Sequence, residues 1–161
     1  MKINEFTGCS SAPTDQDFKE LERTIGSSLP TGFKIHYAKW NGGMPTLDWF
    51  SMQGDWEPLW IHEFLSIESR GAVSNTDSIQ SVYKFATSRG ILPPTLFPFA
   101  IDPGGNYFCL NLDDGSVSYH VNDVWDHGLT QQENQAKAKL YLTDSFEAFL
   151  NALVSEDDAY E

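Results

Sequence analysis

Two glycine turns in aromatic surroundings constrain the fold of this chain more than any other feature of its sequence. Trp40-Asn41-Gly42-Gly43 follows a segment with helical spacing, and Asp102-Pro103-Gly104-Gly105-Asn106 opens a run with strand character. Glycine adopts positive φ angles that residues with a Cβ resist, so it marks places where the chain turns sharply. We expect both turns to be architectural rather than to contact a partner. This structural set comprises Trp40, Asn41, Gly42, Gly43, Asp102, Gly104, Gly105 and Asn106.

The length of 161 residues and a hydrophobic fraction of 40% predict one globular domain with a substantial core. We place this domain at residues 1–154 and expect the acidic segment 155–161 to be a solvated, frayed tail. Cys9 and Cys109 have no paired or metal-ligand spacing, which indicates neither a disulfide framework nor a thiolate metal site. The first residues lack an apolar signal core, and no stretch is long enough to span a bilayer. We therefore expect a cytoplasmic protein without membrane contact.

The chain carries 23 acidic and 10 basic residues, and after residue 90 the only bases are Lys137 and Lys139. Nucleic-acid sites depend on clustered Lys and Arg, so the formal net charge of −13 disfavours direct nucleic-acid binding. The same negative field would speed encounter with a basic protein partner, and salt would weaken that effect. Solubility alone explains an acidic surface equally well.

Periodicity and turn signals predict a mixed α+β domain. Apolar spacing and capping residues indicate helices over 14–25, 29–40 and 76–86. An Asp-Gly turn indicates a hairpin that joins 107–112 to 117–121, and 59–65 has the composition of one strand despite imperfect alternation. Near the end, Asp144 and Glu147 have capping-box spacing, which predicts a last helix docked on the sheet. The apolar stripe of that helix consists of Phe146, Phe149, Leu150 and Leu153.

The order and spacing of these signals resemble the SUKH superfamily, in particular its Smi/Knr-type branch. The matching residues are Leu29-Pro30, Phe33 through Trp40-Asn41-Gly42-Gly43, Pro98-Phe99-Ala100, Asp102 with Gly104-Gly105-Asn106, the Asp-Gly hairpin, and the closing helix from Ser145-Phe146 to Phe149-Leu150. The resemblance spans nearly the whole chain and implies one α+β domain with a mostly antiparallel, curved sheet flanked by helices. It also implies that many bacterial members are immunity proteins, each of which neutralises a toxin domain, often a nuclease. Fold alone does not establish that role.

Two segments, 48–60 and 121–140, are longer and more polar than a minimal domain of this family needs, and such loops can hold partner specificity. Between Lys39 and Arg70 there is no basic residue, while carboxylates alternate with tryptophans, of which Trp56 is best placed for exposure. Carboxylates could pair with the Lys and Arg of a basic cleft, with one or two tryptophans as buried anchors. A second candidate surface consists of the acids at the two ends of the hairpin. The partner-binding candidates are Asp48, Trp49, Asp55, Trp56, Glu57, Trp60, Glu63, Asp113, Asp114, Asp123 and Asp126.

Rival interpretations of the same residues stay open. Each aromatic side chain taken singly is explained equally well as core, with the acids as a solvated rim. Carboxylates of 55–63 could form an acid–base pair around a sugar, but no nucleophile elbow or phosphate-binding loop accompanies them. His120-x-x-Asp123-x-x-Asp126-His127 gathers possible metal ligands in a spacing that matches no established metal motif. We expect no catalysis, no cofactor and no metal.

The sequence therefore favours a cytoplasmic immunity protein that occludes the active cleft of a basic toxin, as a monomer or weak homodimer. One alternative is a non-catalytic adaptor of the same fold that binds a different protein. A more distant alternative is a carbohydrate-binding or hydrolytic protein.

Overall fold

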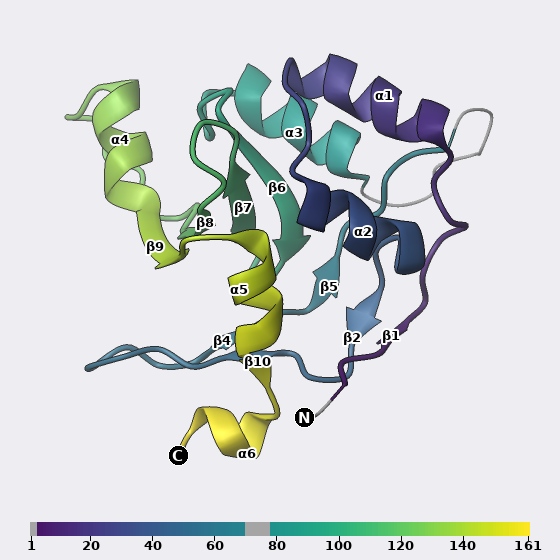
Figure 1. The fold of residues 1–161 in the computed structure, drawn as a ribbon. Coiled ribbons are helices and arrows are strands. Elements are labelled where there is room, and N and C mark those ends of the chain that lie inside the picture. Colours follow the sequence, from purple (N-terminus) through teal and green to yellow (C-terminus); the bar gives the residue numbers. More distant parts are fainter. Residues whose placement is uncertain (1–2, 70–77) are drawn as a thin grey trace.

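Short helices alternate with antiparallel strands in the computed structural model, which describes residues 3–69 and 78–161 (Figure 1). The helices of this part are α1 (Asp15–Ile25), α2 (Thr31–Lys39), α3 (Ile79–Ser88), α4 (Gln131–Ala138), α5 (Phe146–Ala152) and α6 (Glu156–Ala159). The strands are β1 (Phe6–Thr7), β2 (Met44–Pro45), β3 (Trp49–Phe50), β4 (Leu59–Trp60), β5 (Glu63–Phe64), β6 (Leu96–Ile101), β7 (Tyr107–Asn111), β8 (Val117–His120), β9 (Lys139–Thr143) and β10 (Leu153–Val154). The single α+β domain expected from the sequence is confirmed.

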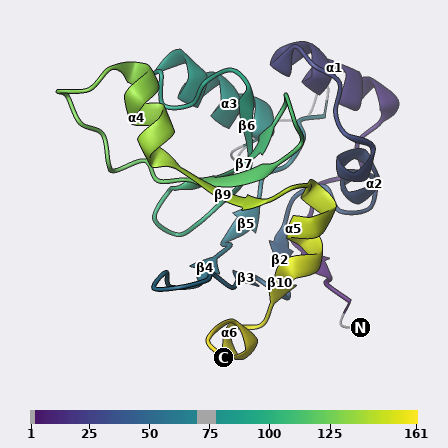
Figure 2. The same cartoon turned by 60° about the vertical axis from the view of Figure 1, so that its left-hand side comes forward.

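Three antiparallel sheets organise the described residues. The largest has the order β5-β6-β7-β8-β9, a second has the order β10-β3-β4, and β1 pairs with β2. In Figure 1, and again in the turned view of Figure 2, α1 and α3 lie at one end of the molecule. The three-stranded sheet and α6 lie at the opposite end. The three-stranded sheet therefore lies far from α1 and α3.

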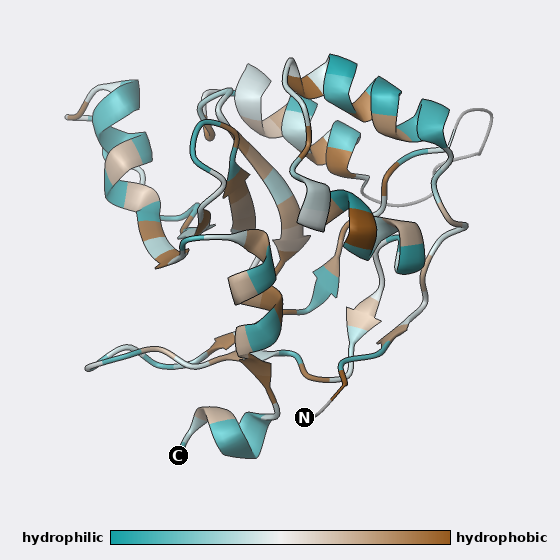
Figure 3. Ribbon diagram, in the orientation of Figure 1, coloured by the Kyte–Doolittle hydropathy of each residue, from teal (hydrophilic) through white to brown (hydrophobic). Residues whose placement is uncertain are grey.

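A cluster of phenylalanines forms the centre of the core. Phe99 of β6 packs edge-on against both Phe146 and Phe149 of α5, with ring centroids 5.1 and 5.4 Å apart. Each fully buried side chain of this size contributes on the order of 1.5–3 kcal/mol. Figure 3 shows β6 and β7 largely in hydrophobic brown, whereas α1 is mostly hydrophilic teal. Both cysteines are free thiols, and Cys109 is fully buried in β7, so this core needs no disulfide.

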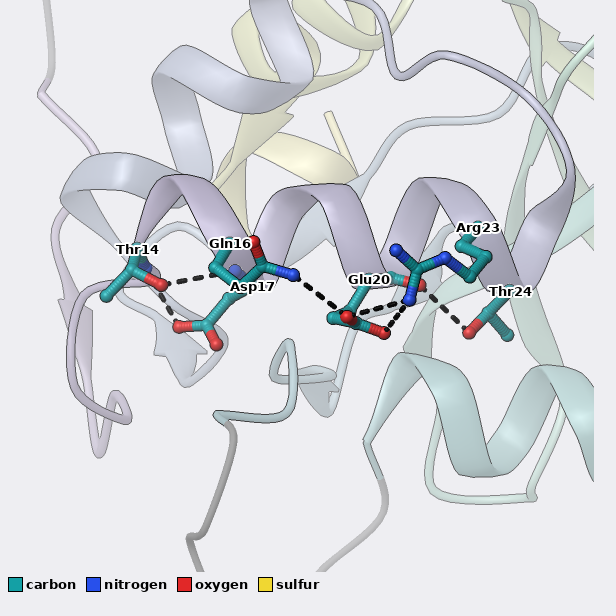
Figure 4. Close-up of polar contacts among 6 residues, drawn as sticks. All are labelled: Thr14, Gln16, Asp17, Glu20, Arg23 and Thr24. Atoms are coloured by element: carbon teal, nitrogen blue, oxygen red, sulfur yellow. Dashed lines mark hydrogen bonds and ion pairs between the residues drawn. The ribbon is translucent and has the colours of Figure 1, made fainter.

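Helix α1 begins and ends where its capping residues predict. Thr14 and Asp17 form a capping box, in which each side chain accepts a hydrogen bond from the backbone N–H of the other, at 2.8 and 3.1 Å (Figure 4). Gly26 follows the helix with a φ of 71°, a left-handed conformation that stops it. On the exposed face, Arg23 donates to Glu20 at 2.8 Å. The helix predicted from 14–25 is confirmed, as are α2 after Pro30 and the hairpin of β7 and β8.

The first glycine turn connects three distant segments. The Asn41 side chain is buried, donates to the carbonyls of Ser11 and Ile67, and accepts from the Ile67 N–H at 2.7 Å. Gly42 and Gly43 have φ angles of 77° and 96°, which residues with a Cβ avoid. A Cβ on Gly43 would lie 2.5 Å from the Thr7 carbonyl oxygen. The turn therefore requires both the asparagine amide and glycine at position 43.

The second glycine turn is organised by one carboxylate. Asp102 Oδ1 accepts from the N–H groups of Gly104 and Asn106, each at 2.9 Å. Its Oδ2 accepts from Asn106 Nδ2 and from the Tyr119 hydroxyl. Burial, and then the bond to Asp102, raises the pKa of Tyr119 well above its usual range, so the phenol stays protonated. Gly105 has a φ of 82°, but a Cβ added to it would have no atom within 4 Å.

The segment 59–65 is not one strand, contrary to its composition. Leu59–Trp60 is β4 of the three-stranded sheet, whereas Glu63–Phe64 is β5 of the five-stranded sheet. Between them, the Ile61 N–H donates to the Asp48 carbonyl at 2.8 Å, and the His62 N–H donates to the Ile101 carbonyl at 2.9 Å. The chain crosses from one sheet to the other at these two residues, which explains the imperfect alternation.

Helix α5 exists, but its predicted cap is wrong. Ser145 is the N-cap, and its hydroxyl accepts from the Ala148 N–H at 3.0 Å. Asp144 instead accepts a hydrogen bond from the Tyr141 hydroxyl. Leu153 lies beyond the helix, in β10, and is buried there. The helix expected over 76–86 begins at Ile79 after a Ser78 cap, and residues 76 and 77 lie outside the described residues.

Among the elements that the sequence does not predict are β6, α4 and β9. Thr130 and Glu133 form a second capping box at the start of α4, so the Thr-x-x-Glu spacing was an available signal. The helix is polar on most sides, with no clear apolar stripe to reveal it. In β6, Pro98 lacks an N–H for the ladder, and the register shifts between Pro98 and Ala100. Because proline is rare inside buried strands, the sequence pattern did not predict β6.

Candidate functional site

The tryptophan-rich segment forms a projecting arm, residues 48–60, that contains β3 and β4. Both views show its loop extending away from the body of the domain (Figures 1 and 2). Trp49 pairs with Trp60 across the two strands, and their rings are stacked, with centroids 6.0 Å apart and an angle of 9°. Trp60 Nε1 donates to Asp48 Oδ2 at 3.0 Å. Strand pairing, ring stacking and this hydrogen bond together fix the two indoles at the base of the arm.

The C-terminal segment completes this surface. Sequence reasoning indicates a frayed tail from residue 155, but Glu156–Ala159 is helical and Ser155 caps it. Ser51 Oγ donates to the Ala159 carbonyl at 3.4 Å, and the Tyr160 ring lies 5.7 Å from the Trp49 ring. The C-terminal residues therefore lie against β3, and nothing in their composition signalled this contact.

The aromatic side chains divide between core and surface. Phe50 is buried and stacks on Phe149, which supports the core interpretation for that residue. Trp60 is 43% exposed, Tyr160 57% and Trp56, at the tip of the arm, 58%. Trp49 is half-buried, which leaves three exposed aromatic rings on the arm and its neighbouring C-terminal segment. Single exposed aromatic residues are common, whereas a group of exposed apolar side chains is typical of an interaction site. The greatest exposure among the tryptophans is at Trp56, as the sequence suggests.

Carboxylates surround these rings without any neighbouring cation in the sequence. Asp55 and Glu57 flank Trp56 and are exposed, and Asp48 is half-buried beside Trp60. The acids of α6 add further negative charge at the same end of the molecule (Figure 2). No Lys or Arg occurs in 40–69 or in 140–161. We call this set the aromatic–acid surface: Trp49, Trp56, Trp60 and Tyr160 with Asp48, Asp55, Glu57, Glu156 and Asp157.

Glu63 belongs to a different part of the fold. It lies on β5 in the five-stranded sheet, paired with Ile101. Asp55 and Glu57 lie in the exposed loop of the arm, where water surrounds the carboxylates. A carboxylate pair for glycoside hydrolysis needs two different environments that separate its pKa values. The arrangement of Asp55, Glu57 and Glu63 does not favour that chemistry.

The acids proposed at the two ends of the hairpin do not form one cluster. Asp113 and Asp114 lie in the β7–β8 turn, where the Ser116 hydroxyl and N–H donate to Asp114 and lower its pKa. Asp123 and Asp126 follow the opposite end of β8, next to Trp125, which is 42% exposed. The first pair is explained by turn chemistry. The second pair and Trp125 form a smaller alternative surface.

The histidines and aspartates of residues 120–127 differ in burial, so they do not form one site. His120 is buried on β8, and neither ring nitrogen has a partner among the described residues. Burial, with a smaller contribution from Lys139, lowers the pKa of His120 to about 4. Asp123, Asp126 and His127 are exposed instead. Within residues 3–69 and 78–161, no group of three or more His, Cys, Asp or Glu side chains is arranged to hold a metal ion.

A groove of about 500 Å³ lies beside α2 and had no signal in the sequence. His36 forms part of its wall, packs edge-on against Phe6 at 4.9 Å, and has a pKa lowered to about 4 by burial. Its ring is therefore neutral at pH 7, and it behaves as part of an aromatic cluster. The groove is lined by Asn4, Phe6, His36, Trp40, Leu47, Leu150, Asn151 and Leu153.

Comparison with known proteins gives a match over most of the chain. A family model described as SMI1 / KNR4 family (SUKH-1) matches residues 12–152. The chain is also similar to the SPbeta prophage-derived uncharacterized protein YokK of Bacillus subtilis (strain 168), with 27% identity. That alignment covers 96% of this chain and 84% of the relative. Among the described residues, none of the helices has the length and apolarity that a membrane crossing requires.

Proposed function

Because this chain belongs to the SMI1 / KNR4 family (SUKH-1), we propose that it is an immunity protein that binds a cognate toxin domain and occludes the toxin's active cleft. The proposed toxin is a basic protein, such as a nuclease, because a cleft that holds nucleic acid needs Lys and Arg side chains. The protein acts in the cytoplasm as a monomer or weak homodimer, without catalysis or a cofactor. Inhibition follows from steric occlusion and from carboxylates that take the place of an anionic substrate.

The observation that carries this proposal is the aromatic–acid surface. Exposed aromatic rings such as Trp60 supply apolar area of the kind found at the centre of tight interfaces. The surrounding carboxylates steer a basic partner toward them and pair with its cations at the rim. The arm and α6 lie at one end of the domain, away from α1 and α3, so a partner can reach them without disturbing the phenylalanine core (Figure 1).

A growth assay tests the proposal. A candidate toxin domain from the genes adjacent to this one is expressed in bacteria, with or without this protein. We expect the wild-type protein to restore growth and Trp60→Ala to lose most of that protection. Trp125→Ala is the matched control, because Trp125 is 42% exposed and Trp60 43%, yet it lies on the alternative surface. If Trp125→Ala loses protection and Trp60→Ala does not, the toxin-binding site lies on the alternative surface instead.

Two other outcomes would overturn the proposal. Absence of protection by the wild-type protein, together with capture of a different protein partner through the same surface, would favour an adaptor of this fold. A change in tryptophan fluorescence on addition of oligosaccharides would favour carbohydrate binding through the arm. If the protein is an immunity protein, we expect neither result.

A further inference from the structure

At the base of the arm, only one of the two carboxylate oxygens of Asp48 accepts a hydrogen bond from the described residues. Asp48 Oδ2 accepts the Trp60 indole N–H at 3.0 Å, and no donor from the described residues reaches Oδ1. The Asp48 carbonyl accepts the Ile61 N–H at 2.8 Å, which fixes the backbone of this residue. The Asp48 carboxylate is thus held beside the N–H edge of the Trp60 indole, and its Oδ1 has no donor among the described residues.

The ring beside this carboxylate is also partly open. Trp49 stacks against the Trp60 ring, and the His62 ring packs edge-on against the same Trp60 ring, with centroids 6.2 Å apart. These two neighbours fix the position of the Trp60 ring. Its 43% exposure nevertheless leaves part of the indole accessible to a partner. Thus a partly exposed indole lies next to a carboxylate oxygen that has no donor among the described residues.

From this pairing we infer that Trp60 and Asp48 form an arginine-recognition site, in which a partner's guanidinium group stacks on the indole and donates to Asp48. The inference rests on the proposed function, because it specifies the chemistry with which the partner meets that same surface. The absence of Lys and Arg from 40–69 and 140–161 means that no cation of these segments competes for the position.

Arginine fits this geometry better than lysine does. A guanidinium group is planar, so it can stack on an indole while its edge donates N–H groups to a carboxylate. An ammonium group is a strongly hydrated point charge without a plane to stack. If arginine is favoured by the lower end of the usual energy range for an exposed cation–π contact, the preference in Kd is about twofold.

The test uses short peptides in place of a toxin. Three capped pentapeptides, with arginine, lysine or neutral citrulline at the centre between glycines, are titrated against the 15N-labelled protein. The reporter is the indole N–H signal of Trp60, assigned by its loss in Trp60→Phe. We expect the arginine peptide to shift this signal at about twofold lower concentration than the lysine peptide, and the citrulline peptide to have little effect.

A pair of variants separates the carboxylate from general charge. Asp48→Asn keeps a side-chain oxygen that can accept the Trp60 N–H but removes the charge, so the arginine peptide should need a higher concentration to shift the signal. Asp113→Asn removes the same charge from the β7–β8 turn and should leave the response to the arginine peptide unchanged. An equal response to all three peptides, or an unchanged response of Asp48→Asn to the arginine peptide, would overturn the inference.

The two proposals can fail separately. Protection from the toxin without any peptide preference would retain the immunity function and remove the arginine site. A clear arginine preference without protection from the toxin would retain the arginine site as a protein-recognition feature and remove the immunity function.

Discussion

Alanine substitution at two glycines with similar φ angles should destabilise the domain to different extents. Gly43 and Gly105 have φ angles of 96° and 82°, and an alanine in this region costs about 1–2 kcal/mol at either position. Around Gly105 nothing lies within 4 Å of an added Cβ, so the cost there ends with the backbone. At Gly43 the added Cβ would lie 2.5 Å from the Thr7 carbonyl oxygen and 2.8 Å from Cys9 Sγ.

Relief of that overlap requires the chain at Gly43 to move away from its hydrogen-bond partner. Gly43 and Phe64 exchange two backbone hydrogen bonds, at 2.8 and 3.0 Å, and each contributes about 1 kcal/mol. Gly43→Ala should therefore cost about 2 kcal/mol more than Gly105→Ala. In a domain of this size that difference corresponds to about 4–8 °C in Tm. Thermal unfolding followed by circular dichroism measures it, and equal Tm values for the two variants would refute the reasoning.

Three further predictions concern stability and the C-terminal contact. Asn41→Ala leaves the Ile67 N–H and two carbonyl groups without their partner, so urea unfolding should show a loss of about 3 kcal/mol, whereas exposed Asn151→Ala should lose little. Because burial lowers the pKa of His36 and of His120 from 6.5 to about 4, the unfolded chain binds more protons between these pH values. Stability should then fall with decreasing pH by about 1.4 kcal/mol per unit for each histidine, and His36→Asn should reduce the slope in urea titrations at pH 4–7. Tyr160→Ala removes the ring beside Trp49 and should shift tryptophan emission to longer wavelength; unchanged emission would contradict the contact.

Local signals in the sequence predicted the elements that depend on local chemistry. The capping box of Thr14 and Asp17 located α1, and the Asp-Gly turn located the hairpin of β7 and β8, because caps and turns act within a few residues. The positive φ angles of Gly43 and Gly105 follow from the same kind of reasoning.

The remaining elements depend on partners distant in the sequence. Ile61 and His62 carry the chain between two sheets, and no local pattern reports a change of partner. Strand β10 forms because Leu153 and Val154 pair with β3, a hundred residues away in the chain. Propensity within a short window does not contain that information.

The candidate site was predictable only in part for the same reason. Alternation of acids and tryptophans indicated the arm, since charge and exposed aromatic residues are visible in the sequence. The stacking of Trp49 on Trp60 and the contact with Tyr160 require the three-stranded sheet to be known. Sequence reasoning therefore identified the segment but not the C-terminal residues that complete its surface.

Calorimetric titration of this protein with a purified candidate toxin domain from the adjacent genes, at low and at high salt, tests the central claim most directly. The account predicts tight one-to-one binding that weakens as salt rises, because charge complementarity steers and supports the interface. It also predicts that Trp56→Ala combined with Asp55→Asn and Glu57→Gln weakens binding and reduces its salt dependence. Absence of binding at both salt concentrations would contradict the claim.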